Sequence, residues 1–576
     1  MPIAPFLAAA IQFEPTLAAK ENNVRQLLAM VEQAAQQGAR LITTPEMATT
    51  GYCWYDRREI APMVETVPGE TTERFTELAQ RYQCYIVLGM PEVDTTTSLY
   101  YNSAVLIGPE GVIGCHRKSH PYISEPKWAA AGDLGHQVFD TPIGRIGMLV
   151  CMDIHYPETA RLLALGGADI ICHISNWLAE RTPAPYWISR AMENSCYVIE
   201  SNRWGLERGV QFSGGSCIIE PNGDIAAVVD DGDGVALAQV DISRSRERQV
   251  LGQPVFSQRR PHDYQTLLSD SFLWNPQDFF GLYGHRPLPE GRQSHISVVQ
   301  YTSAERVDDN LAQIIALTEK AVNEQGSELL VFPERALTGS ATPRDNAQTT
   351  DSAAIQRLTR LAMMLRVHLV VGMAEQDGDI FYNSQMLFGP QGVIGCYRQM
   401  HLSEADRLWA TAGDEWATFD TSLGRVGLLL GNDLLLPEAG RILALEGCDI
   451  LACSAALLTG FTGSHQGSVV KQHYPIPMGA DPLHWHFART RAGENNVYLA
   501  FANGVNDDKG GFSGIFGPET FHFPRNEQVL WQEQAVITQQ IDTRPIANSP
   551  YPTNVVRRKD LVAMRLPHHY TPLIVG

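Results

Sequence analysis

Three residues with complementary chemistry follow apolar segments in the first half of the 576-residue chain: Glu46, Lys118 and Cys151. The glutamate follows LITTP, the lysine follows VIGCHR and the cysteine follows RIGMLV. A cysteine attacks a carbonyl carbon as its thiolate, so it needs a nearby base or a positive charge. A carboxylate can take and return that proton, and an ammonium can stabilise the oxyanion of a tetrahedral intermediate. The set is therefore typical of acyl transfer that uses neither histidine nor a metal, and we expect no metal and no cofactor.

Each of these residues alone has a simpler interpretation. A cysteine after an apolar strand is more often an inert core residue, and a lone glutamate or lysine is usually a solvated surface residue. The combination carries the hypothesis, because strand ends of a buried α/β sheet meet in one crevice, where such folds bind ligands. The prediction is spatial: three side chains far apart in the sequence should meet in one cleft.

The elements that must position these residues occur twice. YYNSAVLIGPEGVIGCHR returns as FYNSQMLFGPQGVIGCYR, and TPIGRIGMLVCMDIHYPETAR returns as TSLGRVGLLLGNDLLLPEAGR. Apolar strands alternate with helical stretches, the first helix being predicted over 23–37, and this alternation favours α/β domains with largely buried sheets. We predict a first domain over 1–270, a Pro- and Gly-rich linker over 271–293 and a second domain over 294–576.

The composition is that of a folded protein, with 44% hydrophobic and 19% charged residues and a formal net charge of −20. No basic run suits a nucleic acid, and no 18-residue apolar stretch suits a membrane span. The N-terminal segment is interpreted as a first strand rather than a signal peptide. Ten cysteines without CxxC pairs favour reduced thiols. We therefore expect a cytoplasmic protein with neither nucleic-acid nor membrane partners.

These motifs resemble those of the nitrilase (carbon–nitrogen hydrolase) superfamily. The resemblance rests on TTPEMATTGY around Glu46, GCHRKSHPY around Lys118 and GMLVCMDIHYPETAR around Cys151, and it covers both copies. It implies an αββα sandwich in each copy, the two being packed as an internal pseudo-dimer through helices and the C-terminal tail. It also implies a second carboxylate, which falls on Glu125 in EPKWAAAGD.

The resemblance further implies an amidohydrolase that forms a cysteine thioester. Cys151 would attack the substrate carbonyl and Glu46 would accept its proton. Lys118 and the backbone N–H of Met152 would hold the oxyanion, and Glu125 would orient Lys118 and the leaving nitrogen. Ammonia or an amine would leave, and water would then hydrolyse the thioester.

The substrate is expected to be a small amide. Met152-Asp153 follows the cysteine where nitrilases proper tend to have Trp-Glu, which looks more like the amidase branches. Nitriles and N-carbamoyl (ureido) compounds stay open; the latter would call for a cation, such as Arg203 or Arg208, to bind the substrate carboxylate.

Residues near the motifs are predicted to shape a compact, partly apolar pocket, although single aromatic residues equally suit core packing. The pocket candidates are Trp54, Tyr55, Trp128, Met152, His155, Tyr156 and Trp177.

The second copy lacks the chemistry of the first. Glycine has no side chain with which to attack, and glutamine carries no charge to stabilise an oxyanion, so the second domain is predicted to be inactive. It would be either a built-in partner that orders the first domain or a tethered remnant. The corresponding residues are Glu334, Gln399, Asp406 and Gly431.

An insertion over 454–488 distinguishes the second copy, and its Gly and Pro content predicts a surface loop. His484 and His486 within it form an HxH pair, which in a loop is usually incidental rather than a metal site.

Three other functions can be compared with amide hydrolysis. A glutaminase that feeds ammonia to a synthetase is disfavoured, because no nucleotide-binding loop of the GxxxxGK[ST] type remains outside the two copies. A lipid-modifying acyltransferase would need membrane spans. A scaffold or binding protein remains the non-enzyme alternative, and the four polar residues of the first copy disfavour it.

Overall fold

The chain forms two compact units, which divide after residue 251. The computed structural model describes residues 3–178, 182–229, 231–250, 252–269, 287–457, 482–505, 510–519, 526–546 and 552–575. Each unit is a mixed α/β domain built on two six-stranded sheets. This confirms the predicted fold class of two tandem α/β domains.

The first unit contains two sheets whose central strands are parallel. The strand order of one sheet is β14 (Gly234–Val240), β1 (Phe6–Gln12), β2 (Ala39–Thr43), β3 (Tyr85–Val93), β4 (Tyr100–Gly108) and β5 (Gly111–Arg117). The other has β13 (Ile225–Val228), β12 (Cys217–Ile219), β9 (Tyr197–Asn202), β8 (Ile170–Ser175), β7 (Gly144–Val150) and β6 (Val138–Thr141). A separate hairpin joins β10 (Trp204–Glu207) to β11 (Val210–Ser213).

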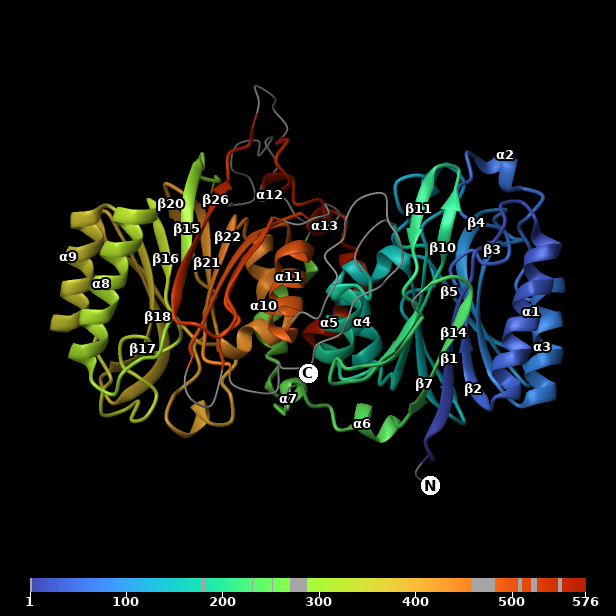
Figure 1. Cartoon of the computed structure of the whole chain (residues 1–576), viewed down its shortest axis with the longest axis horizontal. Coiled ribbons are helices and arrows are strands. Elements are labelled where there is room, and N and C mark those ends of the chain that lie inside the picture. Colours follow the sequence, from blue (N-terminus) through green and yellow to red (C-terminus); the bar gives the residue numbers. More distant parts are fainter. Residues whose placement is uncertain are drawn as a thin grey trace. The chain divides into compact units, whose positions relative to one another are not determined.

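Helices cover the outer faces of both sheets in the first unit. The helices α1 (Lys20–Gln36) and α3 (Glu70–Tyr82) lie on the first sheet, and α4 (Pro157–Leu165) and α5 (Pro185–Asn194) lie on the second, as Figure 1 shows. The layers therefore follow the order helix, sheet, sheet, helix. Short elements complete the unit: α2 (Arg57–Ile60), α6 (Ile242–Arg246) and the 3₁₀ turns η1 (Glu125–Lys127) and η2 (Cys151–His155).

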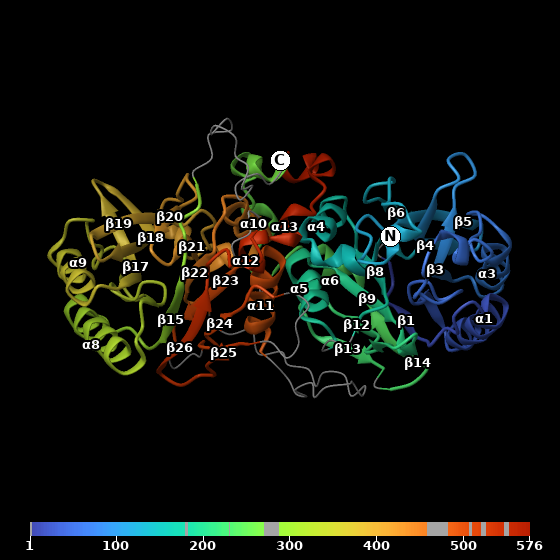
Figure 2. The same cartoon turned by 90° about the horizontal axis from the view of Figure 1, so that it is seen from above.

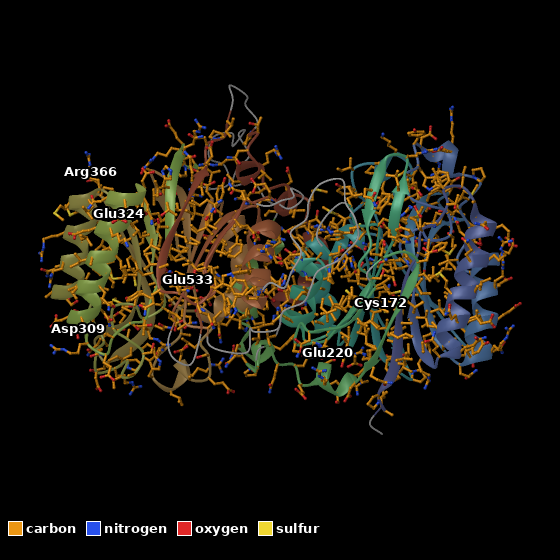
Figure 3. The ribbon with its side chains drawn as sticks, in the orientation of Figure 1. Cys172, Glu220, Asp309, Glu324, Arg366 and Glu533 are labelled. Carbon is orange, nitrogen blue, oxygen red and sulfur yellow. The ribbon has the colours of Figure 1, made fainter. Side chains whose placement is uncertain are left out.

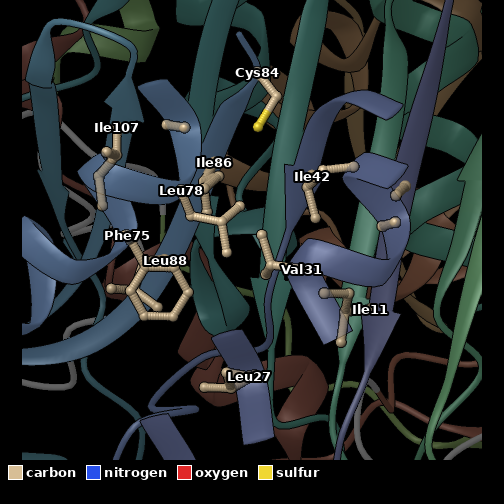
Figure 4. Close-up of a cluster of buried hydrophobic side chains, with 14 of the residues drawn as sticks. Ile11, Leu27, Val31, Ile42, Phe75, Leu78, Cys84, Ile86, Leu88 and Ile107 are labelled. Atoms are coloured by element: carbon tan, nitrogen blue, oxygen red, sulfur yellow. The ribbon is translucent and has the colours of Figure 1, made fainter. Parts of the chain in front are cut away.

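The core between the first sheet and its helices explains why α1 forms where the sequence predicts a helix. Val24, Leu27 and Val31 recur at helical spacing and are buried in one cluster with Phe75 and Ile42. Figure 4 labels the last four of these residues. Complete burial of such a side chain stabilises the fold by about 1.5–3 kcal/mol. The helix begins three residues before the predicted start.

The second unit repeats the two sheets. One sheet has the order β19 (Gly392–Arg398), β18 (Ile380–Gly389), β17 (His368–Asp377), β16 (Leu329–Val331), β15 (Gln293–Gln300) and β26 (Ala535–Asp542). The other has β20 (Thr418–Thr421), β21 (Gly424–Leu430), β22 (Ile450–Ala455), β23 (Tyr498–Asn503), β24 (Gly514–Phe516) and β25 (Gln528–Val529).

Its helices repeat the layer order, with α8 (Val307–Gln325) and α9 (Ala353–Leu365) on the first sheet and α10 (Pro437–Leu445) and α11 (Leu483–Asn495) on the second (Figure 2). The outward face of α8 carries charged side chains, including Asp309 and Glu324, which Figure 3 labels. The short elements are η5 (Asp406–Leu408), η6 (Gly431–Leu435), α12 (Val555–Arg558), α13 (Asp560–Ala563), η7 (Pro567–His569) and α14 (Thr571–Ile574).

The segment after residue 251 packs within the second unit, although the repeat pattern places it in the first copy. It forms α7 (Val255–Gln258) and the 3₁₀ turn η3 (Pro261–Leu268), and its Tyr264 is fully buried. The Tyr264 hydroxyl lies 2.7 Å from His401 Nε2. Arg259 Nε lies 2.9 Å from Glu438 Oε1. The second compact unit therefore begins at residue 252, before residue 294, where the repeat pattern starts the second copy.

The expected loop over 454–488 is wrong at its C-terminal end. His484 and His486 lie in helix α11 and are buried. They belong to this helix because α11 is the counterpart of α5 in the first unit and begins at Leu483. Residues 458–481 of the expected loop, and residues 271–286 of the expected linker, lie outside the described residues. In the described part of the chain, no helix is long and apolar enough to cross a membrane, and no cluster of three or more His, Cys, Asp or Glu side chains has the arrangement of a metal site.

Candidate active site

Glu46, Lys118 and Cys151 each lie just beyond the C-terminal end of a strand, namely β2, β5 and β7. The turn that carries Glu46 packs closely against β3, and only glycine at position 89 allows this approach. A Cβ atom on Gly89 would lie 2.1 Å from the backbone oxygen of Pro45. The close contact sets the height of the Glu46 side chain above the sheet.

The two carboxylates are joined by the lysine. Lys118 Nζ donates to Glu46 Oε1 at 2.8 Å and to Glu125 Oε1 at 2.5 Å. Asn102 Nδ2 also donates to Glu46 Oε1, at 2.6 Å, and the Tyr52 hydroxyl donates to Glu125 Oε1 at 2.6 Å. All of these side chains are buried. The result is an ammonium held between two carboxylates, each of which has a further hydrogen-bond donor.

The Cys151 thiol shares this electrostatic environment. Burial raises the pKa of Cys151, the charge of Glu46 raises it further and the charge of Lys118 opposes this, so that the pKa lies well above its ordinary value. The backbone N–H of Asn176 donates toward the sulfur and also to Glu46 Oε2 at 2.8 Å. The structure thus brings Cys151 together with Glu46, Lys118 and Glu125.

Burial and neighbouring charges shift the pKa values of both Lys118 and Glu125. Burial lowers the pKa of Lys118, but the charges of Cys151, Glu125 and Glu46 raise it more, so that it lies well above its ordinary value. Burial raises the pKa of Glu125 to about 7, against the attraction of Lys118. The ammonium form of Lys118 is therefore strongly favoured.

Asp153 connects the lysine loop to the cysteine turn. Its Oδ1 accepts from the backbone N–H groups of Ser119 and His120 at 3.1 and 3.0 Å. Its Oδ2 accepts from the Val150 N–H at 3.1 Å and lies 2.8 Å from His116 Nε2. Burial raises the pKa of Asp153, but hydrogen bonds from His116 and His120 hold it well below its ordinary value. The carboxylate therefore fixes Lys118 and Cys151 relative to each other.

The predicted pocket residues fall into different surroundings. Trp54 and Trp128 are buried in a small cluster with Tyr52 and Phe212. Tyr55, in contrast, is 68% exposed on the surface of the unit.

The candidates that follow the nucleophile are packed among other rings. His155 stacks on Trp177 with ring centroids 4.7 Å apart, and Tyr156 stacks on His120 at 3.7 Å. Met152 is also buried. That these residues shape a substrate pocket stays a prediction.

Both arginines considered for a substrate carboxylate are engaged within the chain. Arg203 Nη1 lies 2.7 Å from Glu207 Oε2, and Arg208 Nη1 lies 3.0 Å from Glu59 Oε2. The guanidinium of Arg208 also lies over the Tyr55 ring, 4.0 Å from its centroid. A ureido acid would have to compete with these ion pairs.

The corresponding site of the second unit is organised differently. Asn383 Nδ2 donates to Glu334 Oε1 at 2.9 Å and to Gln399 Oε1 at 2.8 Å, and Gln399 Nε2 donates to the backbone oxygen of Leu430 at 3.1 Å. A Cβ atom on Gly431 would lie 2.7 Å from Glu334 Oε2. The space of a nucleophile side chain is thus partly taken by the retained glutamate.

A different residue carries the positive charge in this second site. Arg335 Nη2 lies 3.1 Å from Glu334 Oε1, and its Nη1 lies 2.9 Å from Asp406 Oδ1. Arg335 corresponds to Met47 of the first copy, so the cation follows the glutamate directly instead of ending a strand. Beside Glu334 lies a cavity of about 160 Å³ that is also lined by Tyr301.

Sequence reasoning missed Tyr52, Asn102 and Asp153. The asparagine and the aspartate recur as Asn383 and Asp433, and recurrence in a copy without the cysteine indicates a role in the scaffold that both copies share. No sequence signal distinguished Tyr52 from the neighbouring aromatic residues.

Comparison with known proteins places this fold and site. The sequence matches the carbon–nitrogen hydrolase family over residues 7–249 and again over 295–550. A nitrilase of Pyrococcus abyssi is 35% identical over 259 residues, which cover 44% of this chain and 98% of that protein. Omega-amidase NIT2 of Bos taurus is 26% identical over 279 residues, which cover 46% of this chain and 98% of that protein. A solved carbon–nitrogen hydrolase from Helicobacter pylori matches with a TM-score of 0.41 at 25% identity, over 44% of this chain and 95% of that one.

The chain therefore belongs to the carbon–nitrogen hydrolase family, and it contains two family domains in tandem. Less than half of this chain matches nearly the whole of each of the two relatives, which agrees with the duplication. These relatives support amide-type carbon–nitrogen hydrolysis as the general activity.

Proposed function

We propose that the first domain hydrolyses the carbon–nitrogen bond of a small amide, with Cys151 as nucleophile. One observation carries the proposal: a buried thiol lies in the same electrostatic environment as an ammonium that is hydrogen-bonded to two carboxylates. A raised thiol pKa means that the sulfur is protonated at rest. A base is therefore required, and Glu46 is the carboxylate that also receives the Asn176 N–H.

In the first half-reaction, the Cys151 sulfur bonds to the carbonyl carbon as its proton passes to Glu46. The carbonyl oxygen becomes negative and is stabilised by the Lys118 ammonium and the backbone N–H of Met152. The carbon–nitrogen bond then breaks, and Glu46 returns the proton to the departing nitrogen. Ammonia or an amine leaves, and a thioester remains on Cys151.

In the second half-reaction, water attacks the thioester carbonyl and gives a proton to Glu46. The carbon–sulfur bond breaks, the sulfur takes the proton back, and a carboxylic acid is released. Glu125 contacts the same Lys118 ammonium on its other side and holds it for both oxyanions. We assign Glu125 the further task of orienting the leaving nitrogen.

An amide is favoured over a ureido acid, because both nearby arginines are paired with carboxylates of the chain. The relatives include an omega-amidase as well as a nitrilase, which supports an amide as the substrate class. Ammonia release from a panel of amides, nitriles and ureido acids distinguishes the three classes.

The decisive test is Cys151→Ala. The variant should lose turnover and the acyl adduct that mass spectrometry detects on the residue-151 peptide. Cys396→Ala is a matched control, because it removes a half-buried thiol from the second domain and leaves the proposed site intact. Undiminished turnover by Cys151→Ala would refute the proposal.

We further propose that the second domain is inactive and serves as a built-in partner for the first. The partner role is supported by the segment 252–269, which belongs to the first copy by sequence but whose Tyr264 and Leu267 are buried in the second unit. A fragment of residues 1–290 would expose these side chains and should lose solubility or activity. A soluble and fully active fragment would contradict the partner role and favour a tethered remnant.

A further inference from the structure

Three buried polar side chains lie beneath the cysteine turn, and the proposed reaction does not use them. They are His173 and Ser175 of β8 and Glu200 of β9, and all three are fully buried. His173 Nδ1 contacts Glu200 Oε2, and the Ser175 hydroxyl donates to Glu200 Oε1. The parallel register pairs residue 173 directly with residue 200. We call these residues the His173 triad.

The triad contacts the backbone of the nucleophile residue. His173 Nε2 lies 3.0 Å from the carbonyl oxygen of Cys151. A carbonyl oxygen can only accept, so Nε2 carries a hydrogen and donates it. On the other side of the ring, Nδ1 contacts the Glu200 carboxylate, and this contact fixes the orientation of the ring.

The backbone at Cys151 requires such support. Its φ is 47°, in the left-handed region that a residue with a Cβ atom adopts only at a cost in free energy. A conformation of this kind persists where the surrounding structure holds it. The hydrogen bond from His173 is a direct restraint on this turn, and the turn sets the direction of the sulfur.

The second unit provides an internal comparison. Gly431 has nearly the same φ, 46°, and glycine adopts this conformation without the Cβ penalty. The positions that correspond to the triad are Cys453, Ala455 and Phe501, and Cys453 pairs with Phe501 in the same register. These residues offer no comparable donor to the carbonyl. The triad is thus present where the turn carries a cysteine and absent where it carries a glycine.

We infer that His173, held by Glu200 and Ser175, is a positioning residue that fixes the strained Cys151 turn and thereby directs the sulfur toward Glu46 and Lys118. This inference rests on the proposed function, because the His173 triad positions Cys151 for the reaction only if Cys151 is the nucleophile.

The first test is a stability cycle that needs no substrate. The triad is replaced by its second-copy counterparts (His173→Cys, Ser175→Ala, Glu200→Phe), both in the natural chain and in a Cys151→Gly background. We expect the replacement to lower the melting temperature of the first domain by about 2–4 °C more when residue 151 is cysteine than when it is glycine. Equal shifts in the two backgrounds would overturn the inference.

The second test uses single variants that keep or remove the donor, and it remains decisive if the triple replacement does not fold. His173→Gln retains an N–H near the position of Nε2, whereas His173→Leu does not. Alkylation of Cys151 by iodoacetamide, followed by peptide mass spectrometry, should slow on the order of 10–100-fold in the leucine variant. The glutamine variant should recover most of the rate.

Amide turnover should follow the same order, with the loss in kcat and little change in KM. Equal alkylation rates in the natural chain and the leucine variant would refute the positioning role. The two tests can fail separately. Turnover by Cys151→Ala would refute the role of Cys151 as nucleophile, whereas the coupling between residues 151 and 173 tests only the positioning of the turn.

Discussion

Replacing Glu125 with glutamine tests the electrostatics of the site, because it removes an ionisable group while keeping its shape. Glu125 accepts from Lys118 Nζ at 2.5 Å and from the Tyr52 hydroxyl at 2.6 Å, and it is fully buried. Burial raises its pKa to about 7, from an ordinary value of 4.5. The folded protein therefore binds this proton more tightly than the unfolded chain does.

The sign and size of the effect follow from this difference. Between pH 4.5 and 7 the folded state holds the Glu125 proton while the unfolded chain has released it, so stability falls as pH rises through this window. The stabilisation is fully present below pH 4.5 and is lost above pH 7. A difference of this size corresponds to about 3 kcal/mol.

Urea unfolding of the first domain at several pH values, in the natural chain and in Glu125→Gln, measures the effect. The stability of the natural chain relative to the variant should fall by about 3 kcal/mol between pH 4.5 and pH 7.5. Glutamine does not titrate, so ionisable groups that do not interact with residue 125 cancel in the comparison. A difference that stays constant across this range would refute the raised pKa of the buried Glu125.

Three further predictions concern the site and its scaffold. Lys118→Gln, the residue of the second copy, should lower kcat for amide hydrolysis by about 10²–10³-fold through loss of the oxyanion partner; a decrease below tenfold would contradict its role. Gly431→Cys in a Cys151→Ala background should restore no ammonia release, because Gln399 replaces the lysine that the proposed reaction needs; measurable turnover would show that the second site is only one residue from activity. Leu27→Ala should lower the free energy of unfolding by about 2–5 kcal/mol, because Leu27 is fully buried on the inner face of α1; urea unfolding measures it, and a change below 1 kcal/mol would contradict this packing.

The sequence by itself determined the tandem α/β organisation and the positions of Glu46, Lys118 and Cys151 at strand ends. These features are local, since alternating apolar segments form strands and a repeated pattern forms the same fold again. The comparison of the two copies also located Gly431, where the side chain of a nucleophile is missing. Each of these inferences needs only neighbouring residues and the spacing between them.

Only the tertiary structure decided which distant side chains satisfy one another. Arg335 bridges Glu334 and Asp406 in the second unit, although the position it occupies carries Met47 in the first. His173 reaches the Cys151 carbonyl through the register of β8 and β9. A buried charge or polar group must find its partner within about 3 Å, and the partner depends on which strands pack together rather than on the sequence beside it.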